Sequence, residues 1–264
     1  MPKPLAPPKP KINWRLWIRL VAWTGIAAGL AWGGREVNSF LLRDPRFQFA
    51  CGNNEPSCAN FEIRGAVYTS RARIQNVFAP DFGASVFSMP LAERRRRLLA
   101  LDWVSNASIS RVWPRGIVVT VKERTPVAFA RLPIAGTARS RFSLIDSEGV
   151  LLSIPPRVRF RLPILSGVTE TQTEANRSVR VQAMQHLLDD LGPRAKDISE
   201  INAASTMDMR LITAIDGHAV ELWIGDQHYR SRYRHFVESY EEIGRHSDQS
   251  SVFDLRLDDR ILAK

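Results

Sequence analysis

The chain has 264 residues, 37 basic and 27 acidic side chains, and a formal net charge of +10. Half of this charge lies in the first nineteen positions, where five basic residues occur and no acidic one; over positions 20 to 264, 32 basic residues face 27 acidic ones, a balance of +5. A nucleic-acid-binding protein needs a basic face with base-stacking aromatic residues, so charge gathered at one terminus argues against this class. The five residues are Lys3, Lys9, Lys11, Arg15 and Arg19.

An apolar segment follows the basic, proline-rich start. Its uncharged part, residues 20–34, reaches only ~22 Å, whereas the hydrocarbon core of a bilayer is roughly 30 Å thick. Starting at Trp14 gives ~31 Å if Arg15 and Arg19 snorkel into the headgroup layer. We therefore predict a transmembrane helix over 14–34, preceded by a cytoplasmic tail over 1–13. The alternative is a cleaved signal peptide, because small residues occur over 27–31.

The basic flank predicts the topology of the chain. Positive residues before a span favour a cytoplasmic amino terminus, so everything after Arg35 should be exported, as in a single-pass type II protein. Residues 35–58 then form an exported linker. Within it, Cys51 and Cys58 could form a disulfide in an oxidising compartment, although two free thiols fit almost as well. The absence of neighbouring histidines makes this pair a poor metal site.

The first exported region alternates helical and strand patterns. A short strand ends at Gly65, and Ser70 is a plausible N-cap for the helix that follows. Pro90 opens a second helix, whose run of arginines at 94–97 could bind anionic lipid or nucleic acid but also suits the polar face of an amphipathic helix. Two strands, 104–112 and 117–121, then flank a turn that contains proline and glycine. The predicted order is strand, helix, helix, strand, strand.

The region after residue 125 predicts a second mixed unit. Strands at 142–145 and 150–152 flank an acidic turn, in which Asp146 and Glu148 are solvated loop residues rather than paired catalytic carboxylates. The remaining expected elements are helices over 175–191 and 227–243, and strands over 198–203, 209–215, 219–224, 252–257 and 260–263.

A search for catalytic and metal-binding motifs finds little. The chain has no phosphate-binding glycine-rich loop, no nucleophile elbow and no zinc-protease motif. His228 and His235 share a helical spacing but have no further partner, so we expect exposed histidines. The sequence therefore predicts no catalytic residue, no metal site and no cofactor, and it favours a binding protein over an enzyme.

Several motifs resemble the FtsQ/DivIB family of bacterial division proteins, and the resemblance covers nearly the whole chain. It implies an α+β fold in which a single N-terminal transmembrane helix precedes a POTRA domain, 59–126, and a β-rich domain with flanking helices, 127–264. Departures include Asp102, where the family usually has proline, and the final turn at 258–260, which lacks the usual glycine. The motifs are IRG at 63–65, DWVSNASISRVWP at 102–114, VKERTPVAF at 121–129, LIDSEGVLL at 144–152, LPILSG at 162–167 and VFDLR at 252–256.

The resemblance also implies a function. Such a protein is a bitopic inner-membrane scaffold at the division septum, with its large domain in the periplasm, and it supports septal peptidoglycan synthesis by binding other divisome components. The implied partners are FtsB-like and FtsL-like division proteins and inner membrane lipid. An alternative is a POTRA-containing outer-membrane assembly or secretion component, and a second is a membrane-anchored cell-wall hydrolase.

Two structural expectations follow. Trp103 should be buried between the second helix and the sheet of the first exported domain. The last strand should leave one row of backbone groups unpaired, where a partner strand can add. In the strand over 252–257, the alternating pattern should place Phe253, Leu255 and Leu257 on the packed face and expose the residues between them to water. The resemblance points to the same edge, with partner-binding residues Arg256, Leu257, Arg260, Ile261 and Leu262.

Overall fold

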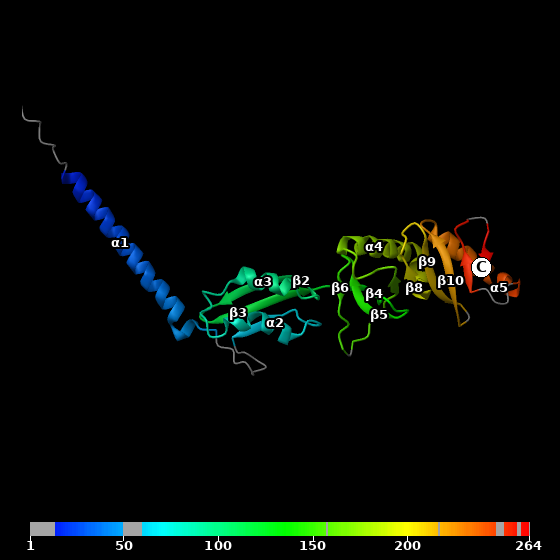
Figure 1. Cartoon of the computed structure of the whole chain (residues 1–264), viewed down its shortest axis with the longest axis horizontal. Helices are drawn as coiled ribbons and strands as arrows, with labels where there is room; N and C mark the ends of the chain where they lie inside the picture. The colour runs from blue at the N-terminus through cyan, green and yellow to red at the C-terminus, as the bar shows by residue number, and fades with distance from the viewer. Residues whose placement is uncertain are drawn as a thin grey trace, which may run out of the picture. The chain divides into compact units, whose positions relative to one another are not determined.

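A computed structural model describes residues 14–49, 60–156, 158–215, 217–246, 251–257 and 260–263. They divide into two compact units (Figure 1). The first contains the described residues up to 64, together with 71–96 and 108–120, and the second contains 65–70, 97–107 and the described residues from 121 onward. Cys51 and Cys58 lie outside the described residues, as do Asp258 and Asp259 of the final turn.

The N-terminal helix α1 runs from Trp14 to Arg43. Its start agrees with the predicted segment, but it continues nine residues past Gly34, and its large apolar side chains are exposed. Within the described residues, no helix is both long and apolar enough to cross a membrane. The helical part of the prediction is confirmed, whereas the spanning part is not. The 3₁₀ turn η1 (Pro45–Phe47) follows α1, capped by the side chain of Asp44.

Among the described residues, the first sheet has three strands, β1 (Phe61–Arg64), β2 (Val104–Val112) and β3 (Gly116–Glu123), in the order β1-β3-β2 with β1 parallel to β3. Helices α2 (Arg71–Phe78) and α3 (Leu91–Leu99) lie between β1 and β2 in the chain, and the turn η2 (Ala79–Asp81) follows α2. This confirms the predicted order of strand, helix, helix, strand, strand. The buried apolar residues of the first unit include Phe61, Ile63, Ile74, Phe78, Ile117 and Val119.

A buried ion pair ties α3 to η2. Arg94 donates from Nε to Oδ2 of Asp81 at 2.6 Å and from Nη2 to Oδ1 at 2.9 Å, and the two side chains are 6% and 8% exposed. These hydrogen bonds raise the pKa of Arg94 above its usual value. The prediction that residues 94–97 all lie on a polar helix face is therefore wrong at Arg94, because its guanidinium has a buried carboxylate to neutralise it.

Trp103 is buried, at 2% exposure, but it does not lie between the second helix and the sheet of the first exported domain, where it was predicted. It belongs to the second unit, where it forms a cluster with Leu144 and Leu152. The Tyr68 ring lies 4.8 Å from the Trp103 ring between centroids, and the indole Nε1 donates to the carbonyl oxygen of Ser153 at 2.9 Å. The prediction of burial is confirmed, and the predicted packing partners are wrong.

The second unit is built on a sheet whose nine strands in the described residues follow the order β12-β11-β10-β9-β8-β7-β4-β5-β6. Helices α4 (Glu174–Leu191) and α5 (Tyr229–His246) contribute side chains to one common core with the sheet. The turn η3 (Gly192–Asp197) follows α4. The strands are β4 (Pro126–Pro133), β5 (Ser140–Asp146), β6 (Leu151–Leu152), β7 (Ile164–Ser166), β8 (Ile198–Asn202), β9 (Met209–Ile215), β10 (His218–Gly225), β11 (Val252–Asp254) and β12 (Leu262–Ala263).

The acidic turn between β5 and β6 forms where it was predicted, but only one of its two acids is solvated: Glu148 is 71% exposed, whereas Asp146 is buried at 4% because Arg124 and backbone N–H groups bind its carboxylate. Oδ1 of Asp146 accepts from the backbone N–H groups of Glu148 at 3.0 Å and Val150 at 2.8 Å. Nη1 of Arg124 donates to both acids, at 2.7 and 2.6 Å. Gly149 adopts a φ of +82°, and a Cβ there would lie 2.3 Å from the carbonyl oxygen of Glu174. The turn therefore requires glycine at position 149, and both carboxylates accept hydrogen bonds from Arg124.

Candidate functional site: the C-terminal sheet edge

The last strand in the described residues, β12, forms one edge of the nine-stranded sheet. It pairs antiparallel with β11, which pairs parallel with β10, so that Asp254 lies beside both Trp223 and Leu262 in the register. Both closing strands are shorter than predicted, with β11 ending at Asp254 and β12 containing two residues. An edge strand presents unpaired backbone N–H and C=O groups to one side, which is what an added strand requires.

The predicted alternation at this edge holds only in part. Phe253 and Leu255 are buried, as expected, but Leu257 is 50% exposed, because the chain leaves the sheet before reaching it. Asp254 was expected to face water and is instead 6% exposed. This carboxylate can be buried because a neighbouring arginine neutralises it.

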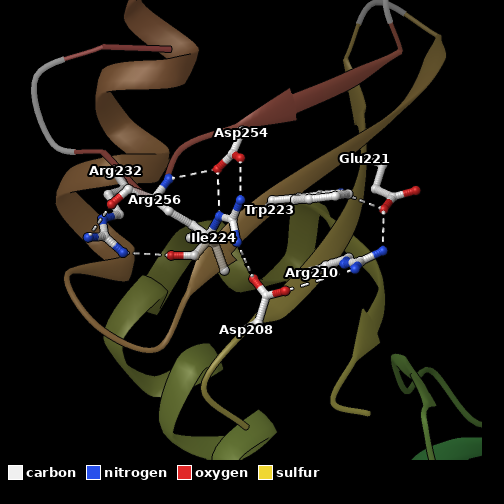
Figure 2. Close-up of polar contacts among 8 residues, drawn as sticks. All are labelled: Asp208, Arg210, Glu221, Trp223, Ile224, Arg232, Asp254 and Arg256. Atoms are coloured by element: carbon white, nitrogen blue, oxygen red, sulfur yellow. Dashed lines mark hydrogen bonds and ion pairs between the residues drawn. The ribbon is translucent and has the colours of Figure 1, made fainter. Parts of the chain in front are cut away.

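Arg256 is the residue that neutralises Asp254 (Figure 2). Its guanidinium donates to both oxygens of that carboxylate, from Nε at 2.8 Å and from Nη2 at 2.6 Å, and its Nη1 reaches Oδ1 of Asp208 at 3.3 Å. The pairing with Asp254 raises the pKa of Arg256 above its usual value. The carbonyl oxygen of Arg256 accepts from Nη2 of Arg232 on α5, at 2.9 Å, so the backbone after β11 is held from two sides.

Trp223 on β10 lies beside two guanidinium groups. The centre of the Arg210 guanidinium is 4.1 Å from the centroid of its ring, and that of Arg256 is 5.1 Å away, both within cation–π range. The indole Nε1 donates to Oε1 of Glu221 at 2.9 Å. Sequence reasoning missed Arg210, Glu221 and Trp223 as part of this surface. Alternation within β10 could have placed Glu221 and Trp223 on one face, opposite the buried Leu222.

Two of the other four predicted residues line a pocket between α5 and the closing strands. It has a volume of about 250 Å³. Leu257 and Ile261 line it, Ile261 also packs partly against the core, and Leu262 is 44% exposed. Arg260 is exposed beside this segment. The remaining lining residues are Ser231, Arg232, Arg234, His235 and Leu255.

The chemistry of this edge suits binding. It combines an edge strand, a pocket with aliphatic and cationic walls, and guanidinium groups stacked on an aromatic ring. Among the residues that the structure describes, no three histidine, cysteine, aspartate or glutamate side chains are grouped to hold a metal ion. His228 and His235 are both exposed, as predicted.

Replacing Arg256 with alanine should lower the free energy of unfolding by ~1–3 kcal/mol, because the buried carboxylate of Asp254 loses its main hydrogen-bond donor. Urea unfolding of the full chain measures this effect. Arg234→Ala, at an exposed arginine of α5, is the control and should change stability by less than ~0.5 kcal/mol. Equal stability of both variants would contradict a structural role for the Arg256 pair.

Two family models match the chain. The POTRA domain, FtsQ-type, matches residues 57–124, and the model described as Cell division protein FtsQ/DivIB, C-terminal, matches residues 135–256. Together the two matches cover more than half of the chain, and the second ends at Arg256, inside the edge described above.

Curated relatives carry the same description. The chain is 30% identical over 212 residues to Cell division protein FtsQ of Koribacter versatilis, a match covering 78% of this chain and 59% of that protein. It is 27% identical over 187 residues to the protein of the same name from Zymomonas mobilis, covering 70% and 53%. With that of Syntrophotalea carbinolica it shares 25% identity over 261 residues, covering 93% and 88%. The chain thus matches between about half and three fifths of the length of the first two relatives.

Proposed function

Because this chain belongs to the FtsQ/DivIB family of cell division proteins, we propose that it is a non-enzymatic scaffold of the bacterial division machinery. It links early and late division proteins through protein–protein binding at the septum and so supports septal peptidoglycan synthesis. The observation that carries this proposal is the open edge at β12, next to a pocket and an arginine-rich surface. The outer-membrane assembly alternative is not favoured, since the relatives described above are cell division proteins.

The proposed binding mode is strand addition to β12. A strand from an FtsB-like protein pairs with the free side of Leu262 and Ala263, and FtsL-like and other divisome components join through that partner. Exposed side chains beside the strand, Leu257 and Leu262, supply apolar contacts. Arg260 supplies positive charge at the edge, Arg256 holds the backbone beside it through its pair with Asp254, and Ile261 lines the adjoining pocket.

We also propose that α1 anchors the chain in the inner membrane as a single-pass type II protein, with its large domain in the periplasm. The support is the basic tail before the helix and the exposed apolar surface of α1, where Trp23, Leu30 and Trp32 are each at least 70% exposed. The proposed modules are the tail 1–13, the span 14–34, the linker 35–58, a POTRA domain over 59–126 and a β domain over 127–264.

Removing residues 260–264, or replacing Ile261 with proline, should abolish binding of the periplasmic segment of an FtsB-like protein. Both changes destroy the strand that the partner pairs with. The measurement is a titration of the reconstituted full chain, with near-ultraviolet circular dichroism as the check that the rest stays folded.

The matched control is Ile154→Pro, placed just after β6 at the opposite edge of the sheet, where the side chain is 43% exposed. This variant should bind like the unmodified chain. Undiminished binding by the truncated chain would refute the assignment of the partner site to β12.

A further inference from the structure

The hairpin between β2 and β3 carries an apolar cluster that the proposed scaffold role does not use. Trp113 is 75% exposed, more than any other tryptophan in the described residues. Val112 beside it is 48% exposed, and Phe87, in the loop before α3, is 38% exposed. Single exposed apolar residues need no explanation, but a contiguous group that includes an aromatic ring marks an interaction surface.

Ring contacts join this cluster to the end of α1. The Phe47 ring is 6.1 Å from that of Trp113, 5.5 Å from that of Phe87 and 5.7 Å from that of Phe40, between centroids. All four belong to the first unit, and Phe47 itself is 5% exposed. The cluster is therefore a continuous platform that begins at the last turn of α1 and ends at the hairpin tip.

The platform is held in shape by Arg111 of β2. Its Nε donates to the carbonyl oxygen of Val86 at 2.6 Å, and its Nη2 donates to that of Met89 at 2.9 Å. These bonds fix the loop that carries Phe87 against the strand that leads to Trp113. Because these hydrogen bonds and the buried Phe47 ring already fix the platform, its exposed side chains need little further ordering when they bind.

The charge around the platform is positive. Arg43 at the end of α1 and Arg115 in the hairpin supply this charge, whereas Arg46 of η1 is already paired with Asp44 through a 3.0 Å contact. Tryptophan and arginine together are typical of the headgroup layer, where an aromatic ring sits among lipid carbonyls and a guanidinium contacts phosphate. Anionic phospholipid is thus complementary to this surface in both polarity and charge.

The distance along α1 is compatible with this contact. Arg43 lies nine residues after Gly34, which is ~13 Å of helix. The headgroup layer is roughly 5–8 Å thick on each side of the hydrocarbon core, and transmembrane helices tilt by about 20° on average. With this tilt the end of α1 still lies ~12 Å from the hydrocarbon core, a few ångströms outside the headgroup layer, so contact depends on long side chains such as those of Trp113 and Arg115 reaching back to it.

We infer that the β2–β3 hairpin, through Trp113 and Arg115, is a second membrane contact that binds the anionic headgroup layer on the exported face. The inference rests on the proposed anchoring by α1. By binding at two points, the protein fixes the orientation of its first unit against the bilayer instead of leaving it free to rotate on the helix.

The test uses bromine quenching of tryptophan fluorescence with the full chain in vesicles of phosphatidylethanolamine and phosphatidylglycerol brominated close to the headgroups. Trp113→Phe should reduce the quenched part of the emission by an amount similar to that for Trp32→Phe in α1. The matched control, Trp223→Phe, removes a tryptophan of the second unit and should leave the quenched part unchanged. Arg115→Glu, or vesicles of phosphatidylcholine alone, should lower the contribution of Trp113.

The outcomes separate the two proposals. Quenching of the α1 tryptophans with no contribution from Trp113 overturns the hairpin contact and leaves the anchor intact. Absence of all quenching overturns both. A contribution of Trp113 that is the same in phosphatidylcholine vesicles overturns the anionic preference, and protection of Trp113 only after a division protein is added reassigns the hairpin to a protein partner.

Discussion

Replacing Trp103 with alanine is expected to lower the free energy of unfolding by ~3–5 kcal/mol, the range for truncating a large buried aromatic residue. The indole is 2% exposed among Leu144, Leu152 and the ring of Tyr68, so its loss leaves a cavity and removes apolar contacts. The carbonyl oxygen of Ser153 also loses its donor. Urea unfolding of the full chain, followed by circular dichroism, measures the change.

Trp113→Ala is the matched control, because the same residue type is removed from a 75% exposed site. It should alter stability by less than ~0.5 kcal/mol in detergent. Trp103→Phe separates the two contributions, since it keeps most of the ring and loses the hydrogen bond, at a cost of about 1 kcal/mol for the latter. If Trp103→Ala and Trp113→Ala lowered the free energy of unfolding by similar amounts, burial of the indole would not explain the loss of stability.

The second large effect is expected at the ion pair between Asp81 and Arg94. Removing either partner, as in Asp81→Ala or Arg94→Ala, leaves a buried charge without its counterion and should cost ~3 kcal/mol or more. Arg96→Ala, at an exposed position of the same helix, should be nearly neutral. Chemical unfolding of the three variants under one set of conditions gives the comparison.

A double variant sharpens this prediction. Replacing Asp81 with leucine and Arg94 with methionine removes both charges and fills the site with apolar atoms, so it should be less destabilising than either single alanine variant. Additive losses in the double variant would show that packing, and not the uncompensated charge, causes the effect.

The local elements of the first unit were predictable from sequence because each has a strong pattern of its own. Two alternating strands around a proline- and glycine-containing turn, and two helices with clear starts, gave the order of elements correctly. In the second unit, β4 and β7 were missed. Residues 164–166 form a strand of only three residues between parallel neighbours, where burial on both faces removes the alternation that reveals strands.

The candidate site was only partly predictable for a related reason. That the chain ends in an edge strand follows from alternation and position, and the structure has β12 at that edge. The stacking of Arg210 and Arg256 around Trp223 depends on the register of β9 with β10 and on the pairing of β10 with β11, which is far from both in the chain. Likewise, no local pattern shows that Asp254 is buried by pairing with Arg256, or that Arg94 finds Asp81.

The position of Trp103 bears on where this chain can be cut. The FtsQ-type POTRA match ends at residue 124 and includes Trp103, whereas Leu144, Leu152 and Phe160, on which the indole packs, lie in the C-terminal match. In a fragment ending at 124, the Trp103 indole would be exposed to solvent. In a fragment starting at 135, the apolar residues that contact this indole would be exposed instead. The two matched regions therefore share one apolar cluster through the Trp103 side chain. Either region expressed alone should be prone to aggregation. Exchange of one region between relatives should succeed only when Trp103 and the residues that contact it are exchanged together.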